Sequence, residues 1–508
     1  MNAVELLLGA EALAKHGARI ALILGDESVT YRQLAEEVKR AGAALSLLGV
    51  KPGQRVLLLM RDTPEFAAAW LGVVRMGAVA IALNNKLSEA EYRHVLADSG
   101  ARLAIIEDVF ADARPDLTDE LVRAGKLVLC GDERAGIPSW RAALRSTGQE
   151  AAFAAEVASP AFCLYSSGTT GRPKGVLHSH GGILHVGHAL RRLGLAAGSR
   201  VFCTSKFFFA YGLEHGLLGP LALGATSILC ADWPDPQKVL EALARHHPDA
   251  LFSVPTVYRR LLAETAAARE PLKRVRYFVS AGERLSSQLV EQWKAACGGE
   301  LLNLYGMSET FCACLLTPPG TSDGVRTGAT LGHLEARLVD DSGEEPPLGR
   351  PGVLWVKHPA QAAGYWNLPE LTRIQFQDGW FCTRDVFMRD AQGYFVHQGR
   401  SDDLVKIAGQ WVQPSELEEI VAAEPAVAEA ACVAVADADG LQRLALFVAA
   451  REDDNEALRA AAEACERALP RHKRPKWLRC VGELPRTATG KVQRYKLREL
   501  LEREATKR

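Results

Sequence analysis

The chain lacks the features that mark metal-binding, disulfide-linked or membrane-spanning proteins. Eleven cysteines are scattered over its 508 residues, none forms a CxxC pair, and the closest two are Cys312 and Cys314. Neither metal-ligand spacing nor a disulfide framework is indicated, and scattered cysteines are typical of small buried side chains in a reducing compartment. The longest apolar runs, such as residues 78–83, are far too short to cross a bilayer. The N-terminus has no basic segment followed by an apolar core, so we expect no signal peptide and a cytoplasmic protein without a membrane partner.

The chain also lacks an excess of charge of either sign. Lys and Arg total 60 and Asp and Glu total 61, which leaves a formal net charge of −1. Nothing in this balance favours nucleic acid or an anionic membrane surface as a partner over a small molecule. The length predicts more than one domain, and a hydrophobic content of 48% is enough to build large cores.

The most informative segment is residues 165–175, Tyr-Ser-Ser-Gly-Thr-Thr-Gly-Arg-Pro-Lys-Gly. The P-loop spacing G-x-x-x-x-G-K-[ST] is absent, because Gly175 and not a hydroxyl residue follows Lys174. Strand-like apolar residues lead into the segment and out of it, which argues against a flexible linker. Glycines that let a ligand approach, hydroxyls and one Lys predict a loop that grips the phosphates of a nucleotide. Its candidate binding residues are Ser166, Ser167, Gly168, Thr169, Thr170 and Lys174.

Strands and helices alternate on both sides of this loop. Apolar runs at 56–60, 78–83 and 103–106 predict buried strands, and helices begin at Thr63 with Pro64 and at a capping box formed by Ser88 and Glu91. After the loop, we expect helices over 235–245 and 255–268 and strands over 250–252 and 275–279. This alternation predicts an α/β fold, with parallel sheets covered by helices.

The last part of the chain changes character twice. From about 325 to 400 short alternating runs, such as 335–339 and 353–356, lie between Gly- and Pro-rich turns and predict β-hairpins, with a turn at 340–343. Beyond about 401 a small α+β unit is expected. Its predicted parts are a capping box of Ser415 with Glu418 after Pro414, strands at 431–436, 444–449 and 477–481, and a helix over 454–469.

Further segments, in the same order along the chain, resemble those of the adenylate-forming superfamily of acyl-CoA synthetases, carrier-protein adenylation domains and luciferases. The segments are the phosphate loop and residues 280–283, 303–310, 380–385, 399–416 and 485–494. The resemblance spans about residues 30–500. It implies a large N-terminal domain, 1–400, and a mobile C-terminal domain, 401–508, that moves on a hinge.

The resemblance also implies roles for single residues. Tyr305 would lie against adenine, Glu309 would hold Mg²⁺, which prefers carboxylate and phosphate oxygens, and Asp385 would accept hydrogen bonds from the ribose hydroxyls. The superfamily usually has Gly before this Asp, whereas this chain has Arg384. The other implied nucleotide-binding residues are Gly282, Glu283, Gly306 and Arg400.

The implied reaction has two halves. A carboxylate attacks the α-phosphate of MgATP, and the thiol of coenzyme A then attacks the acyl-adenylate and releases AMP. Lys491, with Thr170 and Glu309, would serve the first half by offsetting the negative charge that accumulates at phosphorus. Asp402 would be the hinge, and Gly409 would line the thiol tunnel in the second half. The implied cofactors are therefore ATP, Mg²⁺ and coenzyme A.

The substrate is indicated by residues 206–213, which resemble the equivalent stretch of benzoate-CoA ligases, as do residues 409–412. Aromatic side chains with small neighbours suit a flat aryl acid, although three consecutive Phe residues also fit a plain core. Glu214 and His215 are candidates for hydrogen bonding to a ring hydroxyl or amine, and the ring substituents stay open. The candidate acid-binding residues are Phe209, Ala210, Tyr211, Gly212, Ser280, Ala281 and Gly306.

Two other functions stay open at this point. The enzyme could load its acyl group onto the phosphopantetheine arm of a carrier protein, which shares its thiol with coenzyme A. No carrier-like segment follows residue 508, which favours a free ligase. A nucleotide-binding protein without catalysis is the other alternative, and the presence of Lys491, Glu309 and the phosphate loop counts against it. Fold analogy alone predicts a homodimer.

Overall fold

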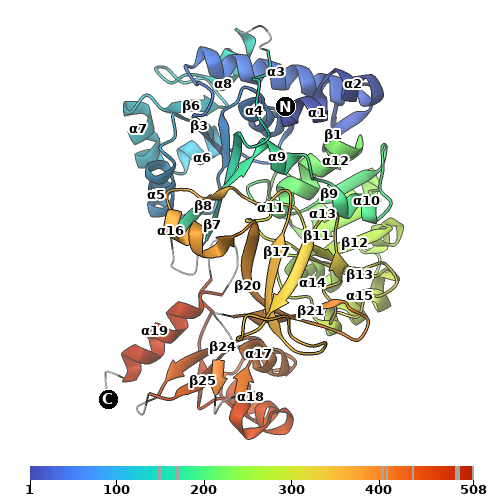
Figure 1. Ribbon diagram of the computed structural model, residues 1–508, viewed down its shortest axis with the longest axis vertical. Coiled ribbons are helices and arrows are strands. Elements are labelled where there is room, and N and C mark those ends of the chain that lie inside the picture. Colours follow the sequence, from blue (N-terminus) through green and yellow to red (C-terminus); the bar gives the residue numbers. More distant parts are fainter. Residues whose placement is uncertain are drawn as a thin grey trace. The chain divides into compact units, whose positions relative to one another are not determined.

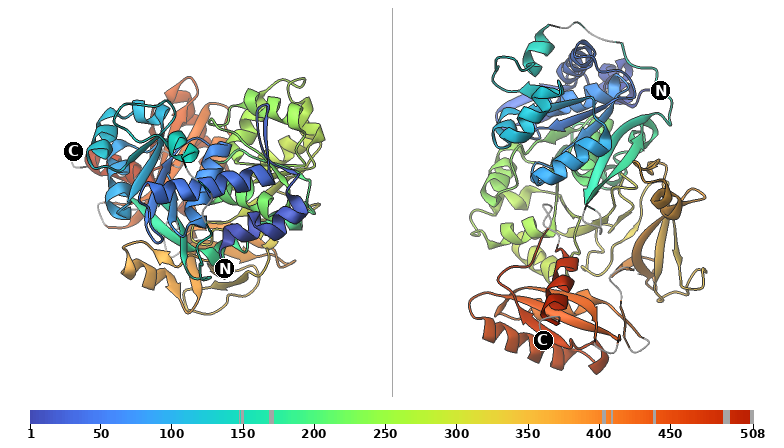
Figure 2. Two further views of the ribbon diagram at one scale, coloured as in Figure 1. Left: turned by 90° about the horizontal axis from the view of Figure 1, so that it is seen from above. Right: turned by 90° about the vertical axis from the view of Figure 1, so that its left-hand side faces the viewer.

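The computed structural model describes residues 1–146, 148, 151–167, 172–401, 405–407, 410–437, 440–486 and 492–505. Over these residues helix-covered sheets are followed by a β-rich part and a small α+β part, and the predicted α/β fold class is confirmed (Figures 1 and 2). Internal contacts divide the chain into two compact units. The first unit comprises Met1–Arg337, Trp355–Cys382 and Arg389–Val396, and the second comprises Leu338–Leu354, Thr383–Met388 and His397–Arg508.

A seven-stranded sheet in the first unit has the order β18-β8-β7-β4-β3-β5-β6. The strands from β7 to β6 run parallel, and β8 and β18 add antiparallel pairs at one end. The three strands predicted before the phosphate loop are confirmed as β3, β4 and β5. The bounds are β3 (Arg55–Leu59), β4 (Val79–Ala82), β5 (Leu103–Glu107), β6 (Leu127–Cys130), β7 (Pro160–Ser167), β8 (Pro173–Ser179) and β18 (Gly364–Tyr365).

The helices of this region begin where their capping residues predict. The Thr63 hydroxyl accepts a hydrogen bond from the Phe66 amide at 3.2 Å at the start of α4, and Ser88 and Glu91 form both bonds of a capping box at the start of α5. Both predicted helix starts are confirmed. The helices are α3 (Tyr31–Leu47), α4 (Pro64–Arg75), α5 (Glu89–Ser99), α6 (Asp108–Asp112), α7 (Pro115–Arg123) and α8 (Trp140–Arg145).

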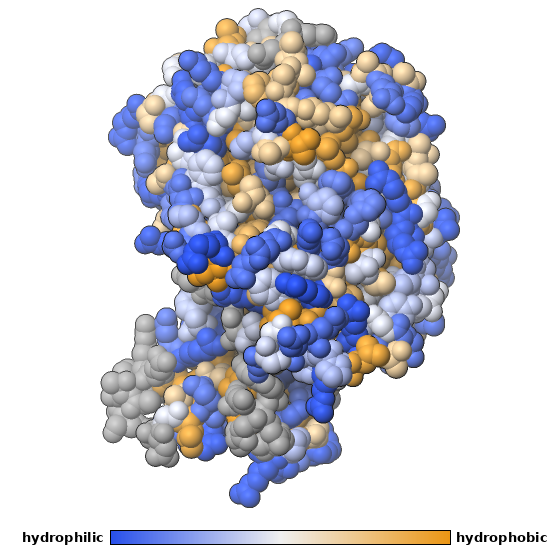
Figure 3. All heavy atoms as spheres, in the orientation of Figure 1, coloured by the Kyte–Doolittle hydropathy of each residue, from blue (hydrophilic) through white to orange (hydrophobic). Residues whose placement is uncertain are grey.

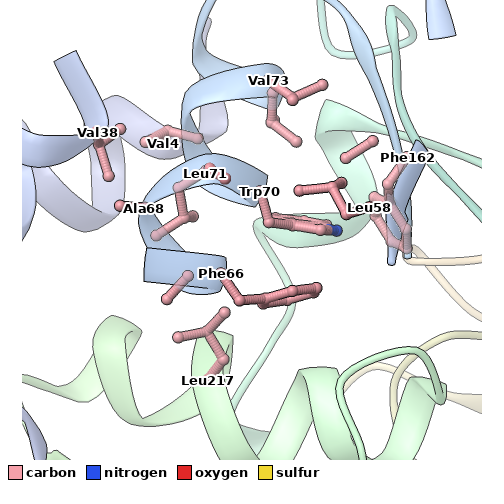
Figure 4. Packing of buried hydrophobic residues seen from close by; sticks show 14 of the residues in the cluster. Val4, Val38, Leu58, Phe66, Ala68, Trp70, Leu71, Val73, Phe162 and Leu217 are labelled. Atoms are coloured by element: carbon pink, nitrogen blue, oxygen red, sulfur yellow. The ribbon is translucent and has the colours of Figure 1, made fainter. Parts of the chain in front are cut away.

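Successive residues of β3 belong to two different cores, which shows that both faces of the sheet are covered. Leu58 packs in the cluster that holds Phe66 and Trp70 of α4, whereas Leu57 packs in a separate cluster with α5 and α7. Figure 4 shows Trp70 pointing toward Phe162 of β7, with ring centroids 5.5 Å apart. Complete burial of such side chains stabilises the fold by roughly 1.5–3 kcal/mol each.

A nine-stranded sheet completes the first unit, in the order β15-β14-β13-β12-β11-β9-β10-β1-β2. Its strands from β13 to β1 are parallel. Two separate cores again cover its faces, one with α13, α14 and α15 and one with α10. The strands are β1 (Ile20–Leu24), β2 (Glu27–Thr30), β9 (Arg200–Cys203), β10 (Thr226–Ile228), β11 (Ala250–Ser253), β12 (Tyr277–Ser280), β13 (Leu301–Tyr305), β14 (Leu315–Leu316) and β15 (Ala329–Thr330).

The helices of this half follow the predicted positions with one difference. The helix expected over 235–245 is confirmed as α13, but the one expected over 255–268 ends as α14 at Ala263. The Thr265 hydroxyl accepts a hydrogen bond from the Ala268 amide at 3.2 Å, and such a local turn competes with helix continuation. The helices are α1 (Ala3–Leu8), α2 (Ala10–His16), α9 (His180–Ile183), α10 (His188–Arg192), α11 (Ala210–Leu213), the π-helical η1 (Glu214–Leu218), α12 (Gly219–Leu223), α13 (Pro236–His246), α14 (Pro255–Ala263), the 3₁₀ turn η2 (Glu270–Arg274) and α15 (Ser287–Cys297).

The predicted β-hairpin region forms a five-stranded sheet in which β21 pairs with β20 beside the path β16-β17-β20-β19. The turn predicted at 340–343 is present, with the Ser342 amide donating to Asp340 Oδ1 at 2.8 Å and Gly343 at φ +87°. The elements are β16 (Glu335–Val339), β17 (Gly352–Lys357), α16 (Pro369–Gln375), β19 (Phe376–Gln377), β20 (Trp380–Arg389) and β21 (Phe395–Arg400).

The C-terminal elements match the predicted order, but the predicted capping box of Ser415 and Glu418 is wrong. Helix α17 starts two residues earlier than this box implies, with Gln413 as a cap without a side-chain bond and Pro414 as its first residue. Glu418 instead accepts from the Cys432 amide at 2.7 Å and pairs with Arg494. The elements are β22 (Val405–Ile407), β23 (Gln410–Val412), α17 (Pro414–Ala422), β24 (Val427–Ala436), β25 (Gln442–Ala450), α18 (Asp454–Ala468), the 3₁₀ turn η3 (Arg471–Lys473), β26 (Trp477–Cys480) and α19 (Arg494–Ala505).

Hydrophilic and hydrophobic residues lie side by side over the face shown in Figure 3. Among the described segments, no helix is both long and apolar enough to span a membrane.

Candidate active site

The predicted phosphate loop connects two antiparallel strands of the first unit. Ser166 of β7 lies opposite Lys174 of β8, and Ser167 lies opposite Pro173. The paired strands therefore fix both ends of the loop and place Ser166 and Lys174 next to each other at its base. Gly168, Thr169 and Thr170 lie outside the described residues.

A tyrosine that the sequence analysis did not select connects the base of this loop to Glu309. The Lys174 ammonium lies 4.6 Å from the centroid of the Tyr365 ring, and the Tyr365 hydroxyl donates a hydrogen bond to Glu309 Oε1 at 2.8 Å. The Glu309 carbonyl also accepts from the Ala362 amide at 2.8 Å. Tyr365 thus lies between a predicted phosphate-binding cation and the predicted metal-binding carboxylate. In the sequence, Tyr365 stands only in a short Gly-Tyr-Trp run, residues 364–366. This run matches no motif that predicts a binding or catalytic residue.

The turn that carries Glu309 is fixed by a second residue of β8. His178 Nε2 donates to the Ser308 carbonyl at 2.8 Å, and the His178 ring stacks on Phe162 with centroids 4.7 Å apart. Burial lowers the pKa of His178 to about 4, so the ring is neutral at pH 7. Phe311 has φ +57°, a rare conformation for a bulky residue, and packs edge-on against Phe162. These contacts attach Ser308 and Phe311, on either side of Glu309, to residues of β7 and β8.

The carboxyl ends of the parallel strands bring the predicted adenine and acid residues to one edge of the nine-stranded sheet. Strands β12 and β13 are adjacent, with Ser280 opposite Asn303, so Gly282 and Tyr305 follow at the same edge. Ligands in α/β folds bind at such edges. Gly282 takes φ +84°, and Glu283 accepts a hydrogen bond from the Thr256 hydroxyl at 3.1 Å. The predicted residues Ala281 and Gly306 belong to the same two segments.

Tyr211 joins this edge to α11. Its hydroxyl lies 3.2 Å from the Ser253 carbonyl at the end of β11 and 3.1 Å from the Val279 carbonyl of β12, and its ring packs on the core of that sheet face. Burial raises the pKa of Tyr211 well above its ordinary value, so the phenol stays protonated. Gly212 is required next to it, because a Cβ there would lie 2.2 Å from the Lys206 carbonyl oxygen. The predicted residues Phe209 and Ala210 lead into this helix.

Glu214 and His215 follow Tyr211 in the η1 segment, and each side chain is 1% exposed. Glu214 Oε2 accepts from the Ala313 amide at 2.9 Å. His215 Nδ1 lies 3.1 Å from the Tyr211 carbonyl, and its ring stacks on Phe252 with centroids 4.8 Å apart. Burial raises the pKa of Glu214 to about 8 and lowers that of His215 to about 4, so both are mainly neutral at pH 7.

Replacing Glu214 with glutamine should stabilise the protein increasingly as pH rises. Above the ordinary glutamate pKa of 4.5 the unfolded chain releases this proton, whereas the folded protein holds it up to about pH 8. In the wild type, the contribution of the raised Glu214 pKa to the free energy of unfolding is therefore complete below pH 4.5 and is lost as pH rises through 8. We expect the difference in unfolding free energy between the Glu214→Gln variant and the wild type to increase by roughly 4 kcal/mol, in favour of the variant, from pH 4.5 to pH 8. Urea unfolding from pH 4.5 to 8.5 measures this gain, with Glu291→Gln on α15 as the exposed control, and curves that stay parallel contradict it.

The second unit holds the predicted ribose-binding carboxylate. Asp385 is 7% exposed and lies 3.5 Å from an Arg400 guanidinium nitrogen and 3.7 Å from His397 Nε2. Arg384, in place of the usual Gly, takes φ +59°, and its carbonyl accepts from the Ser401 amide at 2.7 Å. Arg384 therefore takes a left-handed conformation, which favours Gly, within strand β20. Asp402, Gly409 and Lys491 lie outside the described residues.

This strain at Arg384 predicts an unusual order of substitutions. Arg384→Gly should be neutral or stabilising by up to about 1 kcal/mol, whereas Arg384→Val should destabilise by about 2 kcal/mol because a β-branched residue fits φ > 0 poorly. The exposed Lys357 of strand β17 supplies the control. At this strand position we expect the Val variant to be more stable than the Gly variant, which is the reverse of the order at 384. Thermal unfolding of the four variants measures both orders. A Val variant at 384 as stable as the Gly variant would contradict the left-handed backbone conformation at this position.

Comparison with known proteins shows the family of the chain. A family model described as AMP-binding enzyme matches residues 9–366, and a model described as AMP-binding enzyme C-terminal domain matches residues 416–491. The chain therefore belongs to the AMP-binding enzyme family, and the adenylate-forming resemblance seen in its motifs is confirmed.

Individual relatives match over almost their whole length. The chain is 40% identical to the 3-hydroxybenzoate–CoA ligase of Aromatoleum sp. (strain CIB), covering 99% of this chain and 97% of that protein. It is 38% identical to the benzoate–CoA ligase of Thauera aromatica, covering 98% and 95%. Among solved structures, the anthranilate CoA ligase AuaEII in complex with anthranoyl-AMP has a TM-score of 0.87 at 32% identity, covering 98% of this chain and 97% of that chain.

Proposed function

We propose that this chain is an AMP-forming aryl acid–CoA ligase that activates a benzoate-like acid with MgATP and transfers the aryl group to coenzyme A. The observation that carries the proposal is the cluster of aromatic rings formed by Tyr211, Phe252 and His215 near the carboxyl ends of β11 and β12. Sites for aromatic acids are lined by apolar and aromatic side chains with a few fixed polar groups, and this cluster supplies such side chains. The relatives named as benzoate and hydroxybenzoate CoA ligases support the same substrate class.

In the first half-reaction a carboxylate oxygen of the acid attacks the α-phosphorus of ATP, and pyrophosphate leaves. The loop from Ser166 to Lys174 would hold the phosphates, and Glu309 would hold the Mg²⁺ that neutralises part of their charge. The Glu309 carboxylate is half-buried and oriented by Tyr365, which fits a ligand for a hard cation. Lys491 would donate to the oxygens that gain charge during the attack.

The resemblance to the adenylate-forming superfamily supports roles for single residues toward the nucleoside end of ATP. Tyr305 would lie against the adenine, between the Gly282–Glu283 turn and Gly306. Asp385 would accept hydrogen bonds from the ribose hydroxyls, as an ionised carboxylate can, and Arg400 would contact the nucleotide.

In the second half-reaction the thiol sulfur of coenzyme A attacks the acyl carbon, the bond from that carbon to the phosphate oxygen breaks, and AMP leaves with that oxygen. We propose that the C-terminal domain, 401–508, turns about Asp402 between the two halves and that Gly409 then lines the thiol's path. A carrier protein as acyl acceptor is not favoured, because the relatives matched over nearly full length are named CoA ligases. The homodimer expected from fold analogy stays a prediction.

The test is a mass-spectrometric product assay with MgATP, coenzyme A and a panel of benzoates and aliphatic acids. We expect an aryl-CoA thioester and AMP from benzoates and little product from aliphatic acids. Aryl-adenylate that accumulates without a thioester would contradict coenzyme A as the acceptor. The absence of any adenylate would contradict the proposed ligase activity.

A further inference from the structure

A buried nitrogen at the candidate acid site accepts no hydrogen bond from the described residues. His215 Nε2 is fully buried and has no partner there, and the same holds for the Ser280 hydroxyl at the end of β12. Most buried polar atoms in proteins are paired, because an unpaired one loses its hydrogen bonds to water without replacement. A partnerless buried atom beside a ligand site therefore suggests that the ligand supplies the missing group.

The hydrogen-bond pattern around His215 determines what kind of group is missing. Its Nδ1 lies 3.1 Å from the Tyr211 carbonyl oxygen, which can only accept, so Nδ1 carries the proton. Burial lowers the pKa of the ring to about 4, which keeps it neutral at pH 7. In a neutral imidazole with the proton on Nδ1, Nε2 is an acceptor. The missing partner is therefore a hydrogen-bond donor.

The surroundings of His215 place this acceptor in the aromatic cluster that carries the proposed function. The imidazole lies 4.8 Å from the Phe252 ring and 5.1 Å from the Tyr211 ring, centroid to centroid. Tyr211 in turn contacts the carbonyls at the ends of β11 and β12. Next to His215, Glu214 binds the Ala313 amide beyond the Glu309 turn. His215 therefore packs on Tyr211, a predicted acid-binding residue that also contacts β12, the strand that ends at the predicted residue Ser280.

We propose that His215 Nε2 accepts a hydrogen bond from a hydroxyl or amino group on the ring of the substrate, so that the enzyme selects a donor-substituted benzoate over benzoate itself. This inference rests on the proposed function. It assigns to His215 a direct hydrogen bond with the substrate ring. Neither half-reaction requires this bond, so its effect is on substrate selection. A site with a buried, unpaired acceptor discriminates strongly against an analogue that lacks the donor.

The wild-type enzyme gives the first comparison, with benzoate and its 2-, 3- and 4-hydroxy, amino and methoxy derivatives. We expect kcat/KM for at least one hydroxy or amino compound to exceed that for benzoate by tenfold or more. The methoxy analogue at that position should gain nothing, since it has no donor. Comparison of kcat/KM for the hydroxy and the amino derivatives shows which of the two substituents the site binds. Equal values for benzoate and every donor-substituted acid would overturn the proposal even if all are good substrates.

Variants then assign the effect to His215. His215→Leu should lower kcat/KM for the preferred acid by tenfold or more while that for benzoate stays equal or rises, and His215→Gln, which keeps an acceptor, should restore part of the preference. The matched control is His180→Leu, because His180 is also 1% exposed with an unpartnered Nε2 and lies in α9. It should leave the ratio of the two acids unchanged.

The outcomes separate this inference from the proposed function. If no acid in the panel gives an adenylate, the proposed function fails. If benzoates react but His215→Leu lowers all of them equally, or Ser280→Ala and not His215→Leu abolishes the preference, this inference fails and the ligase stands. Thermal unfolding verifies that each variant folds, and if His215→Leu does not fold, the wild-type comparison of hydroxy with methoxy acids still decides.

Discussion

Replacing Lys491 with alanine should lower the rate of adenylate formation by about 10²–10³-fold, the usual loss when one charged donor to a transition state is removed. The attacking carboxylate and the α-phosphate are both negative, so the charge that develops between them needs a cation. Thioester formation from a synthetic aryl-adenylate and coenzyme A should stay near the wild-type rate. In this step the thiol attacks the acyl carbon, so no negatively charged carboxylate approaches the phosphate. Single-turnover assays of the two half-reactions measure the contrast.

Lys496→Ala is the control for this variant, since Lys496 is an exposed lysine at the start of the neighbouring helix α19. It should leave both half-reactions unchanged. Because Lys491 lies outside the described residues, its role rests on the segment 485–494 alone. An equal loss in both half-reactions would show that Lys491 supports the fold and not adenylate formation.

Glu309→Gln should reduce adenylate formation by about 10²-fold at physiological Mg²⁺ and shift the Mg²⁺ dependence to higher concentrations. Glutamine has the same shape, and its carbonyl oxygen can accept the hydrogen bond that Tyr365 donates to Glu309 Oε1. The substitution therefore removes the charge without removing the contact, and Mg²⁺ prefers a carboxylate to a neutral amide. Mg²⁺ titrations of pyrophosphate release measure the shift.

Tyr365→Phe provides the matched comparison for Glu309. It removes the hydroxyl bonded to Glu309 but keeps the ring that faces the Lys174 ammonium. We expect a smaller loss, of about tenfold or less, because the carboxylate is still present but less well oriented. If Glu309→Gln left turnover and its Mg²⁺ response unchanged, the metal-binding assignment would be wrong.

Local signals in the sequence were sufficient for most elements of the fold. The Thr63 cap and the Ser88–Glu91 box depend on residues three positions apart, so the chain alone determines them. The expected box at Ser415 failed because Glu418 finds a stronger partner in Arg494, which lies 76 residues away. The early end of α14 has a local cause in Thr265, which helix periodicity does not report.

The candidate site divides in the same way. Residues within continuous motifs, such as Lys174, Glu309 and Asp385, could be selected from spacing and resemblance. Tyr365 and His178 could not, because their importance comes from contacts with segments more than 50 residues away. The left-handed conformation of Arg384 likewise became visible only in the backbone, since an arginine gives no sequence signal for φ > 0.

The central claim, activation of a carboxylic acid through an adenylate, is tested most directly with an acid labelled with ¹⁸O in its carboxylate. After turnover with MgATP and coenzyme A, one labelled oxygen should appear in the phosphate of AMP and none in pyrophosphate. This follows because the attacking carboxylate oxygen stays on phosphorus when the thiol breaks its bond to carbon. Label in inorganic phosphate together with ADP, or unlabelled AMP beside the thioester, would contradict the account.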